Sequence, residues 1–347
     1  MKTTTKKQTS FFSWFRDMWM NHPLFSTGIA LLVMIVLQTL ALGFDFPSIG
    51  AWFNVWARNW VNILRNNAGV GIIALGMTFV IISGGIDLAV GSTLVAVGAV
   101  LMMFIDSGAK GILAGIGISG APAFAIGILV AAGFGTVLGE ITGLLITKGK
   151  LPPFIATLGT MKICRSVTQQ FMQGYTPTVP KPFLQIASFE IGGQMLMPIL
   201  YWGLLAYLLH VVSKRTTFGR HVFAVGSNER TAKLSGVNVQ KVKRRVYALM
   251  GSLVVLAAVL QVSRIGSMDY ANAGSGYEMD AIAAVIVGGT SMSGGKGSIV
   301  GTVLGMLIIA EMNNLLNLMG VPPFLREACK GVIVIGAVLL QKKESAS

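Results

Sequence analysis

Long apolar segments without charges are the feature that most constrains how this chain can fold. Residues 24–44 run without a charged side chain, and a membrane-spanning helix needs roughly 20 apolar residues. Charged residues make up only 12% of the 347 residues, well below the share typical of soluble domains, so one water-soluble core could not bury the remaining apolar surface. We therefore predict an all-α, polytopic bundle of transmembrane helices. About ten spans are expected, at residues 24–44, 66–83, 88–105, 120–146, 154–172, 195–212, 246–263, 281–297, 299–319 and 328–341.

The formal net charge of +14 would fit a nucleic-acid-binding protein, but the distribution of the charges does not. Lysine and arginine alternate between the predicted loops. On the side of the N-terminus there are 18 and on the other side 7, while Lys162 and Arg165 fall within a predicted span. Such an excess marks the cytoplasmic face of a membrane protein. Both termini and the basic loop at residues 213–245 are therefore predicted to be cytoplasmic.

The chain is expected to form one membrane domain with two short flanking segments. Residues 1–23 combine lysines with a cluster of Phe and Trp, a composition typical of a helix that lies in the membrane interface. The apolar run that follows is longer than the 7–15 residues of a cleaved signal peptide, so we expect the segment to be retained. The membrane domain is predicted over residues 24–341, and residues 342–347 form a cytoplasmic tail.

A glycine-rich stretch at residues 83–92 interrupts the apolar pattern and contains a carboxylate, Asp87. A charge near the centre of a bilayer costs roughly 2.5–3.5 kcal/mol, and broken backbone is tolerated there only inside protein or against a water-filled cavity. Two interpretations stay open. Asp87 either caps the next span by accepting hydrogen bonds from backbone N–H groups, or it takes part in gating or in contact with a substrate.

A second glycine-rich stretch, residues 288–298, has the same layout about 205 residues later. In both, an apolar helix ends in a glycine cluster, and a short polar stretch precedes another glycine-containing helix. Glycine-interrupted segments at matching positions predict an internal repeat and a pathway between the halves. The stretch is not a phosphate-binding P-loop, because Thr290 stands at the first glycine position and Gly297 at the Ser/Thr position. The chain is therefore not expected to hydrolyse ATP itself.

Within the basic loop, residues 227–236 predict a short helix. Asn228 is a favourable N-cap, Glu229 lies in the first turn, and Gly236 provides the C-terminal stop. A helix of two turns is marginally stable alone, which favours a docking element held by a cytoplasmic partner. The alternative is a basic anchor in which the helix is incidental.

Several short motifs, taken together and in order, resemble the permease subunit of bacterial ABC importers for monosaccharides of the ribose, galactose, xylose and arabinose type. The resemblance covers nearly the whole chain after about residue 60. It is carried by Gly84-Gly85-Ile86-Asp87-Leu88, Pro153-Phe154-Ile155-Ala156-Thr157-Leu158-Gly159-Thr160-Met161, Phe218-Gly219-Arg220, Ala224-Val225-Gly226, Leu234-Ser235-Gly236-Val237-Asn238-Val239, Asp280-Ala281-Ile282-Ala283-Ala284-Val285 and Ser293-Gly294-Gly295-Lys296-Gly297.

The resemblance implies import of a small sugar across the bacterial inner membrane by a pore of two permeases, either two copies or a paralogous pair. Implied partners are two cytoplasmic ATPase subunits, which carry ATP and Mg²⁺, and a periplasmic sugar-binding protein. The chain itself is then a non-catalytic subunit without a metal or cofactor. The resemblance also implies that residues 227–236 are the coupling helix that sits in a groove of the ATPase. The coupling candidates are Asn228, Glu229, Arg230, Ala232, Leu234 and Gly236.

A passing sugar requires weak polar contacts, because tight binding would slow its release. The candidates for the pore or its gate are Gly84, Gly85, Asp87, Ser92, Thr93, Asn313, Asn314 and Asn317, with Glu140 and Glu311 as further carboxylates within spans. The asparagines could instead form hydrogen bonds between helices. Glu278 and Asp280, at the outer end of a span, are candidates for contact with the binding protein. Cys164 and Cys329 lack partners at metal-ligand spacing, so we assign them no chemistry.

The alternative from another class is a secondary transporter driven by an ion gradient. In it Asp87, Glu140 and Glu311 would relay protons, as carboxylates within membranes often do. Against it stands the basic loop with its embedded short helix, which a self-sufficient carrier does not need. An intramembrane enzyme is the third option, and the absence of an HExxH, GxSxG or paired-cysteine motif argues against it.

Overall fold

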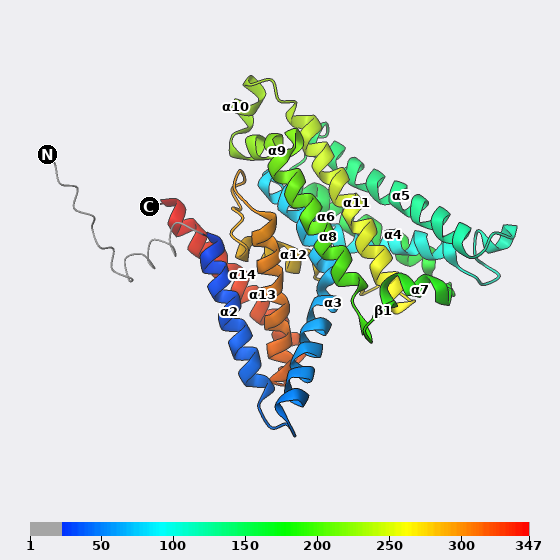
Figure 1. Ribbon diagram of the computed structural model, residues 1–347. Helices are drawn as coiled ribbons and strands as arrows, with labels where there is room; N and C mark the ends of the chain where they lie inside the picture. Colours follow the sequence, from blue (N-terminus) through cyan, green and yellow to red (C-terminus); the bar gives the residue numbers. More distant parts are fainter. Residues whose placement is uncertain (1–22, 347) are drawn as a thin grey trace.

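Helices dominate the computed structural model, which describes residues 23–346 (Figure 1). The elements are α2 (Pro23–Leu42), α3 (Ile49–Ile82), α4 (Val90–Ile105), the 3₁₀ turn η1 (Ala114–Ile116), α5 (Ala121–Thr147), α6 (Pro153–Met172), α7 (Lys181–Ser188), β1 (Glu190–Ile191), β2 (Gln194–Met195), α8 (Met197–Arg215), α9 (Thr217–Ser227), α10 (Glu229–Leu234), α11 (Val239–Ile265), α12 (Tyr277–Val287), α13 (Ile299–Leu318) and α14 (Pro323–Ala346). The two strands form a small antiparallel hairpin.

The all-α membrane fold is confirmed. Within the described part of the chain, six helices are long and apolar enough to cross a membrane, namely α2, α3, α5, α8, α11 and α13, and α4 is a shorter apolar helix. Most expected spans match a helix within a few residues. The count of ten spans stays a prediction, and residues 1–22 of the predicted interfacial segment lie outside the described residues.

The expected span at 281–297 is wrong in its second half. Helix α12 ends at Val287, and residues 288–298 are not helical. Gly289 adopts a left-handed conformation with φ of +84°, which only glycine adopts without strain and which commonly ends a helix. Eleven residues of helix extend roughly 16 Å, about half of a bilayer core. Gly288 and Thr290 at the start of this irregular segment are buried, whereas Met292, Ser293 and Lys296 are exposed.

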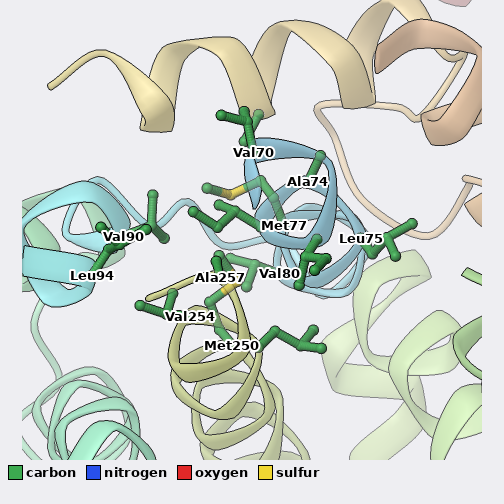
Figure 2. Packing of buried hydrophobic residues seen from close by; sticks show 14 of the residues in the cluster. Val70, Ala74, Leu75, Met77, Val80, Val90, Leu94, Met250, Val254 and Ala257 are labelled. Atoms are coloured by element: carbon green, nitrogen blue, oxygen red, sulfur yellow. The ribbon is translucent and has the colours of Figure 1, made fainter. Parts of the chain in front are cut away.

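The core is built around α3 and α11. Every residue of α3 from Val70 to Ile82 is buried, and a helix that is apolar on all sides belongs in such a position. In Figure 2, Met77 of α3 packs with Val254 of α11 and Val90 of α4. By contrast α2, α5 and α8 expose large apolar side chains at their surfaces, as expected of helices that face lipid or another subunit.

Small residues allow the backbones of α5 and α11 to touch. A side-chain Cβ at Gly139 of α5 would overlap the carbonyl oxygen of Tyr247, and one at Gly251 of α11 would overlap that of Gly135. Glycine at such positions is typical of helix pairs in membranes, where close van der Waals packing replaces the hydrophobic effect as the source of association.

The loop that follows α4 and the loop that follows α6 are joined by hydrogen bonds to Asp106. The carboxylate of Asp106, which follows α4, accepts hydrogen bonds from the backbone N–H groups of Gly108 and Thr178, both at 2.8 Å. It also accepts one from the Tyr175 hydroxyl at 2.5 Å. Burial by itself would raise the pKa of Asp106, but these three hydrogen bonds favour the ionised form and lower the pKa overall.

These hydrogen bonds are expected to loosen in acid. The folded pKa of Asp106 lies below its unfolded value of about 3.9. Its contribution to stability is therefore complete above that value and is lost as pH falls through the folded pKa. Hydrogen exchange at Gly108 and Thr178, corrected for intrinsic rates, should be slow near neutral pH and faster below about pH 4. Asp106→Asn should exchange faster at neutral pH; protection equal to that of the wild type would contradict the assignment.

Candidate coupling and gating site

The basic segment between α8 and α11 is helical rather than an open loop. The predicted short helix is confirmed as α10: the side chain of Asn228 accepts a hydrogen bond from Thr231 N–H at 2.9 Å, and Gly236 follows the helix with φ of +83°. Helix α9, which precedes it, was not predicted. Its N-cap is Thr216, whose hydroxyl accepts from Gly219 N–H at 3.2 Å, and this Thr is the sequence signal that could have located it.

Helix α10 projects from one end of the molecule with α9 beneath it (Figure 1). Ala232 packs inward, whereas Arg230 and Lys233 are exposed. Leu234 is 82% exposed, which leaves a large apolar side chain at the tip of the projection without cover in the single chain. A 2.6 Å ion pair joins Glu229 to Lys243 of α11. Helix α10 therefore presents one apolar side chain, Leu234, and two cations, Arg230 and Lys233, at its surface.

Behind α10, three segments of the chain lie in close contact. We call this contact the glycine junction, and it comprises Ile82, Gly226, Ser227, Gly294 and Gly295. The Gly295 N–H donates to the carbonyl oxygen of Ile82 at 2.9 Å. A Cβ on Gly226 would overlap that same oxygen and would lie 2.6 Å from the Gly295 nitrogen. The junction therefore joins the end of α3, the base of the α9–α10 projection and the second glycine-rich stretch. These are the three places where the sequence departs from a plain helical bundle.

The two glycine-rich stretches begin with the same backbone structure. In each, a left-handed glycine follows the last helical turn, Gly84 with φ of +81° and Gly289 with φ of +84°. The residue after that glycine donates to the carbonyl five positions earlier, at 2.9 Å in the first stretch and 3.1 Å in the second. This is the Schellman arrangement. The resemblance predicted between the stretches is therefore present at their first turns, while a repeat of the whole halves stays a prediction.

Asp87 is almost fully buried, and its side chain accepts a hydrogen bond from the Ala89 N–H at 2.9 Å. The N-cap residue of α4, Ala89, has no capping side chain of its own, so Asp87 supplies this contact. Next to it is a cavity of about 10 Å³ whose lining includes Thr93 and Thr142, about the space of one water molecule. The capping interpretation thus has direct support, and a further role of Asp87 in gating stays a prediction.

Of the other candidates in the first stretch, Gly84 is exposed, Gly85 is partly buried, and Ser92 and Thr93 are buried. Ser92 is buried and donates to the Ala89 carbonyl at 2.8 Å, and Thr93 is buried beside it. Gly85 approaches Tyr247 so closely that an added Cβ would lie 2.6 Å from the Tyr247 hydroxyl. None of Gly85, Ser92 and Thr93 is exposed to an open channel in this conformation of the single chain.

The asparagines of α13 lie far from the glycine junction. Roughly 20 Å of helix separates the start of α13, which follows the second stretch, from Asn313. Asn313 and Asn314 are partly buried, and the exposed Asn317 accepts a hydrogen bond from Arg326 at 3.2 Å. These asparagines are therefore separated from the glycine junction by most of the length of α13.

The remaining carboxylates have different surroundings. Glu140 of α5 is half-exposed and pairs with Arg244 of α11, whose Nε lies 2.6 Å from it. Glu311 is fully buried, and neither of its oxygens has a hydrogen-bond partner within the part of the chain that the structure describes. The contact of Glu140 with a fixed cation makes it a poor proton relay.

Glu278 and Asp280 lie in the first turn of α12. The Asp280 carboxylate forms a 2.9 Å ion pair with Lys330 of α14, and both side chains are about 15% exposed. Glu278 is partly buried, close to Gly91 of α4. Contact of these residues with another protein stays a prediction, and Asp280 is already engaged within the chain.

The family model and the similar curated proteins are all permease components of transport systems. The family described as branched-chain amino acid transport system / permease component matches residues 59–339. The ribose import permease protein RbsC of Bacillus subtilis is 43% identical over 83% of this chain and 86% of its own length. The corresponding Escherichia coli K12 protein is 39% identical over 91% and 92%. The xylose transport system permease protein XylH of Haemophilus influenzae is 33% identical over 88% and 94%. No solved structure matches the chain at a significant level.

Proposed function

Because this chain belongs to the family of permease components of ATP-driven (ABC) importers, we propose that it forms the pore through which a monosaccharide crosses the membrane. The family description names branched-chain amino acids, whereas the similar permeases are named for ribose and xylose. These relatives favour a sugar as the cargo. They also favour an ATP-driven importer over a carrier driven by an ion gradient.

The proposed assembly contains this chain in the bacterial inner membrane, with a second copy or a paralogous permease beside it. A cytoplasmic ATPase subunit, which binds ATP and Mg²⁺, would grip α10, and a periplasmic sugar-binding protein would dock on the opposite face. The basic excess around α9, α10 and the start of α11 supports the cytoplasmic position of this end. The exposed Leu234 supports α10 as the docking element, because an apolar anchor at the centre of an interface contributes much of its binding energy.

The glycine junction is the observation on which the proposed mechanism depends. Closure of the ATPase dimer would displace α10 and, with it, Gly226 and Ser227. Because Gly226 touches Ile82 and Gly295 through backbone atoms alone, no side chain can change rotamer to absorb the displacement. The motion would pass as a rigid-body shift to the end of α3 and to the stretch that opens α13. These segments border the first and second glycine-rich stretches, where the transmembrane helices are interrupted.

Reconstitution tests the proposed function. Proteoliposomes that contain this chain, the ATPase subunit and the binding protein should accumulate labelled sugar only when ATP is supplied on the ATPase side. Proteoliposomes with this chain alone should show no uptake under a proton or sodium gradient. Gradient-driven uptake by the chain alone would contradict the proposal and would favour the secondary transporter.

Substitution of Asp87 separates its capping role from a role for its charge. Asp87→Asn keeps an oxygen that can accept from the Ala89 N–H, whereas Asp87→Ala removes it. We expect Asp87→Ala to lower stability by about 1 kcal/mol, the usual cost of a lost N-terminal cap, and to reduce uptake severalfold. Asp87→Asn should retain most of the uptake. Thermal unfolding and uptake in cells measure both effects, and a folded but inactive Asp87→Asn would show that the charge itself is required.

A further inference from the structure

A hollow of about 360 Å³ opens on the surface between the ends of α5 and α11 that lie toward α10. It is lined entirely by polar and charged residues: Glu140, Asn238, Gln240, Lys241, Arg244 and Arg245. The proposed coupling mechanism makes no use of it. It lies at the depth where the proposed orientation places the cytoplasmic surface of the membrane.

The hollow has an excess of positive charge. Arg244 is paired with Glu140, so that one cation is compensated within the chain. Lys241 and Arg245 are exposed, and neither has an ion-pair partner among the described residues. Two positive charges on adjacent turns of one helix are therefore left to attract an anion.

One of these charges, that of Lys241 in the first turn of α11, also opposes the helix on which it lies. Lys241, Lys243, Arg244 and Arg245 all belong to the first seven residues of α11, whose first turn holds no acidic residue. The N-terminal end of a helix carries a partial positive charge, so cations are unfavourable there. Lys243 is paired with Glu229 of α10 and Arg244 with Glu140 of α5, so Lys241 and Arg245 are the two cations without an ion-pair partner among the described residues. A local conflict of this kind is expected where a site serves a ligand rather than the stability of the helix.

Beside the hollow, α5 carries an apolar stripe. Phe134, Val137, Ile141 and Leu145 are between 36% and 54% exposed, and their spacing of three and four residues places them along one face of the helix. Val137 and Ile141 lie on either side of Glu140 in sequence, and Leu145 lies near the end of α5. A cationic hollow that adjoins an exposed apolar stripe matches an amphiphile with an anionic head and hydrocarbon chains.

We propose that the hollow binds the headgroup of an anionic phospholipid from the cytoplasmic leaflet, with its acyl chains along the apolar stripe of α5. The lipid phosphate would lie between Lys241, Arg244 and Arg245, where charge-assisted hydrogen bonds are strongest. Basic pockets on the cytoplasmic side of membrane helices recognise such headgroups. The proposal rests on the orientation that the proposed function assigns to the chain.

Native mass spectrometry of the purified full-length chain, incubated with equal amounts of phosphatidylglycerol and phosphatidylcholine, tests the proposal. The wild type should retain one phosphatidylglycerol per chain in preference to phosphatidylcholine. The double variant Lys241→Gln/Arg245→Gln should retain on the order of tenfold less, because each basic residue near a headgroup contributes to its binding. Arg220→Gln, which removes an exposed cation from α9 outside the hollow, should bind lipid as the wild type does.

Equal retention of the two lipids by the wild type would overturn the proposal, as would unchanged retention by the double variant. If the double variant kept its lipid but lost co-purification with the ATPase subunit, the hollow would be a protein contact instead. Misfolding is controlled by thermal unfolding without lipid, where the double variant should be as stable as the wild type because both side chains are exposed and have no ion-pair partner among the described residues. The lipid measurement needs neither sugar nor ATP, so a failure of the transport proposal would not be mistaken for a failure of this one.

Discussion

Gly226→Ala is expected to abolish ATP-driven sugar uptake while the chain still inserts into the membrane. The added Cβ would overlap the carbonyl oxygen of Ile82 and lie 2.6 Å from the nitrogen of Gly295. Both neighbours are backbone atoms, so α9 must move away from α3 or from the second glycine-rich stretch. Overpacking of this kind costs about 1–3 kcal/mol. Movement of α9 away from Ile82 or Gly295 also breaks the glycine junction, through which α10 is proposed to act. We expect uptake to fall at least about tenfold.

A matched glycine substitution controls for the general effect of an added methyl group. Gly203→Ala lies in α8, where a Cβ meets no atom within 4 Å, and it should leave uptake unchanged. Co-purification with the ATPase subunit separates the causes of a loss. Retained association without uptake indicates that the junction transmits motion, and wild-type uptake by Gly226→Ala would refute the role assigned to the junction.

Loss of α10 should have the largest effect of all. Deletion of residues 228–235, or Gly236→Pro, is expected to eliminate both uptake and association with the ATPase subunit. Proline cannot adopt the φ of +83° found at Gly236, and it lacks the N–H that donates to the Lys233 carbonyl at 3.1 Å. The turn that ends α10 would therefore be lost, and Leu234 would be displaced with it.

Gly236→Asn is the control for this change, because asparagine tolerates the left-handed conformation and keeps the N–H group. It should retain most of the uptake and of the ATPase association. Membrane insertion of all three variants is measured by their yield in the membrane fraction. Normal uptake and association after Gly236→Pro would show that α10 is not the coupling element.

Features set by neighbouring residues were predictable from the sequence. Apolar length located α2, α4, α5 and α13, although Glu140 and Glu311 lie within the last two. Local capping located α10, because Asn228 and Gly236 act within one turn of the helix that they bound. The error at α12 had a local cause too: the apolar composition of residues 281–297 outweighed the helix-ending signal of Gly288 and Gly289.

Features set by distant residues were not predictable. Helix α3 starts at Ile49, well before the expected 66, although Arg58 and Arg65 interrupt its apolar pattern. Its early turns are joined to the C-terminal part of α2 and the residue after it. The indole N–H of Trp52 donates to the Gly43 carbonyl at 3.0 Å, and that of Trp56 donates to the Thr39 hydroxyl at 3.1 Å. No local motif around Trp52 or Trp56 indicates that Gly43 and Thr39 are their hydrogen-bond partners.

The glycine junction shows the same limit at the candidate site. It joins Ile82, Gly226 and Gly295, which are far apart along the chain, and the contacts among these three residues are made by backbone atoms. The sequence marked the two glycine-rich stretches and α10 as unusual, but it contained no sign that they touch. Gly226 was noticed only as part of a family motif. Its role follows from the space around it.

The position of α10 on the ATPase side of the membrane is the central claim, and thiol labelling of Leu234→Cys tests it most directly. With Cys164 and Cys329 replaced by serine, the introduced thiol is the one that labels, and Leu234 is 82% exposed in the single chain. We predict that a membrane-impermeant reagent fails to label it in intact cells, labels it in inside-out vesicles, and is blocked there by the bound ATPase subunit. Labelling from the outside of intact cells would contradict the account.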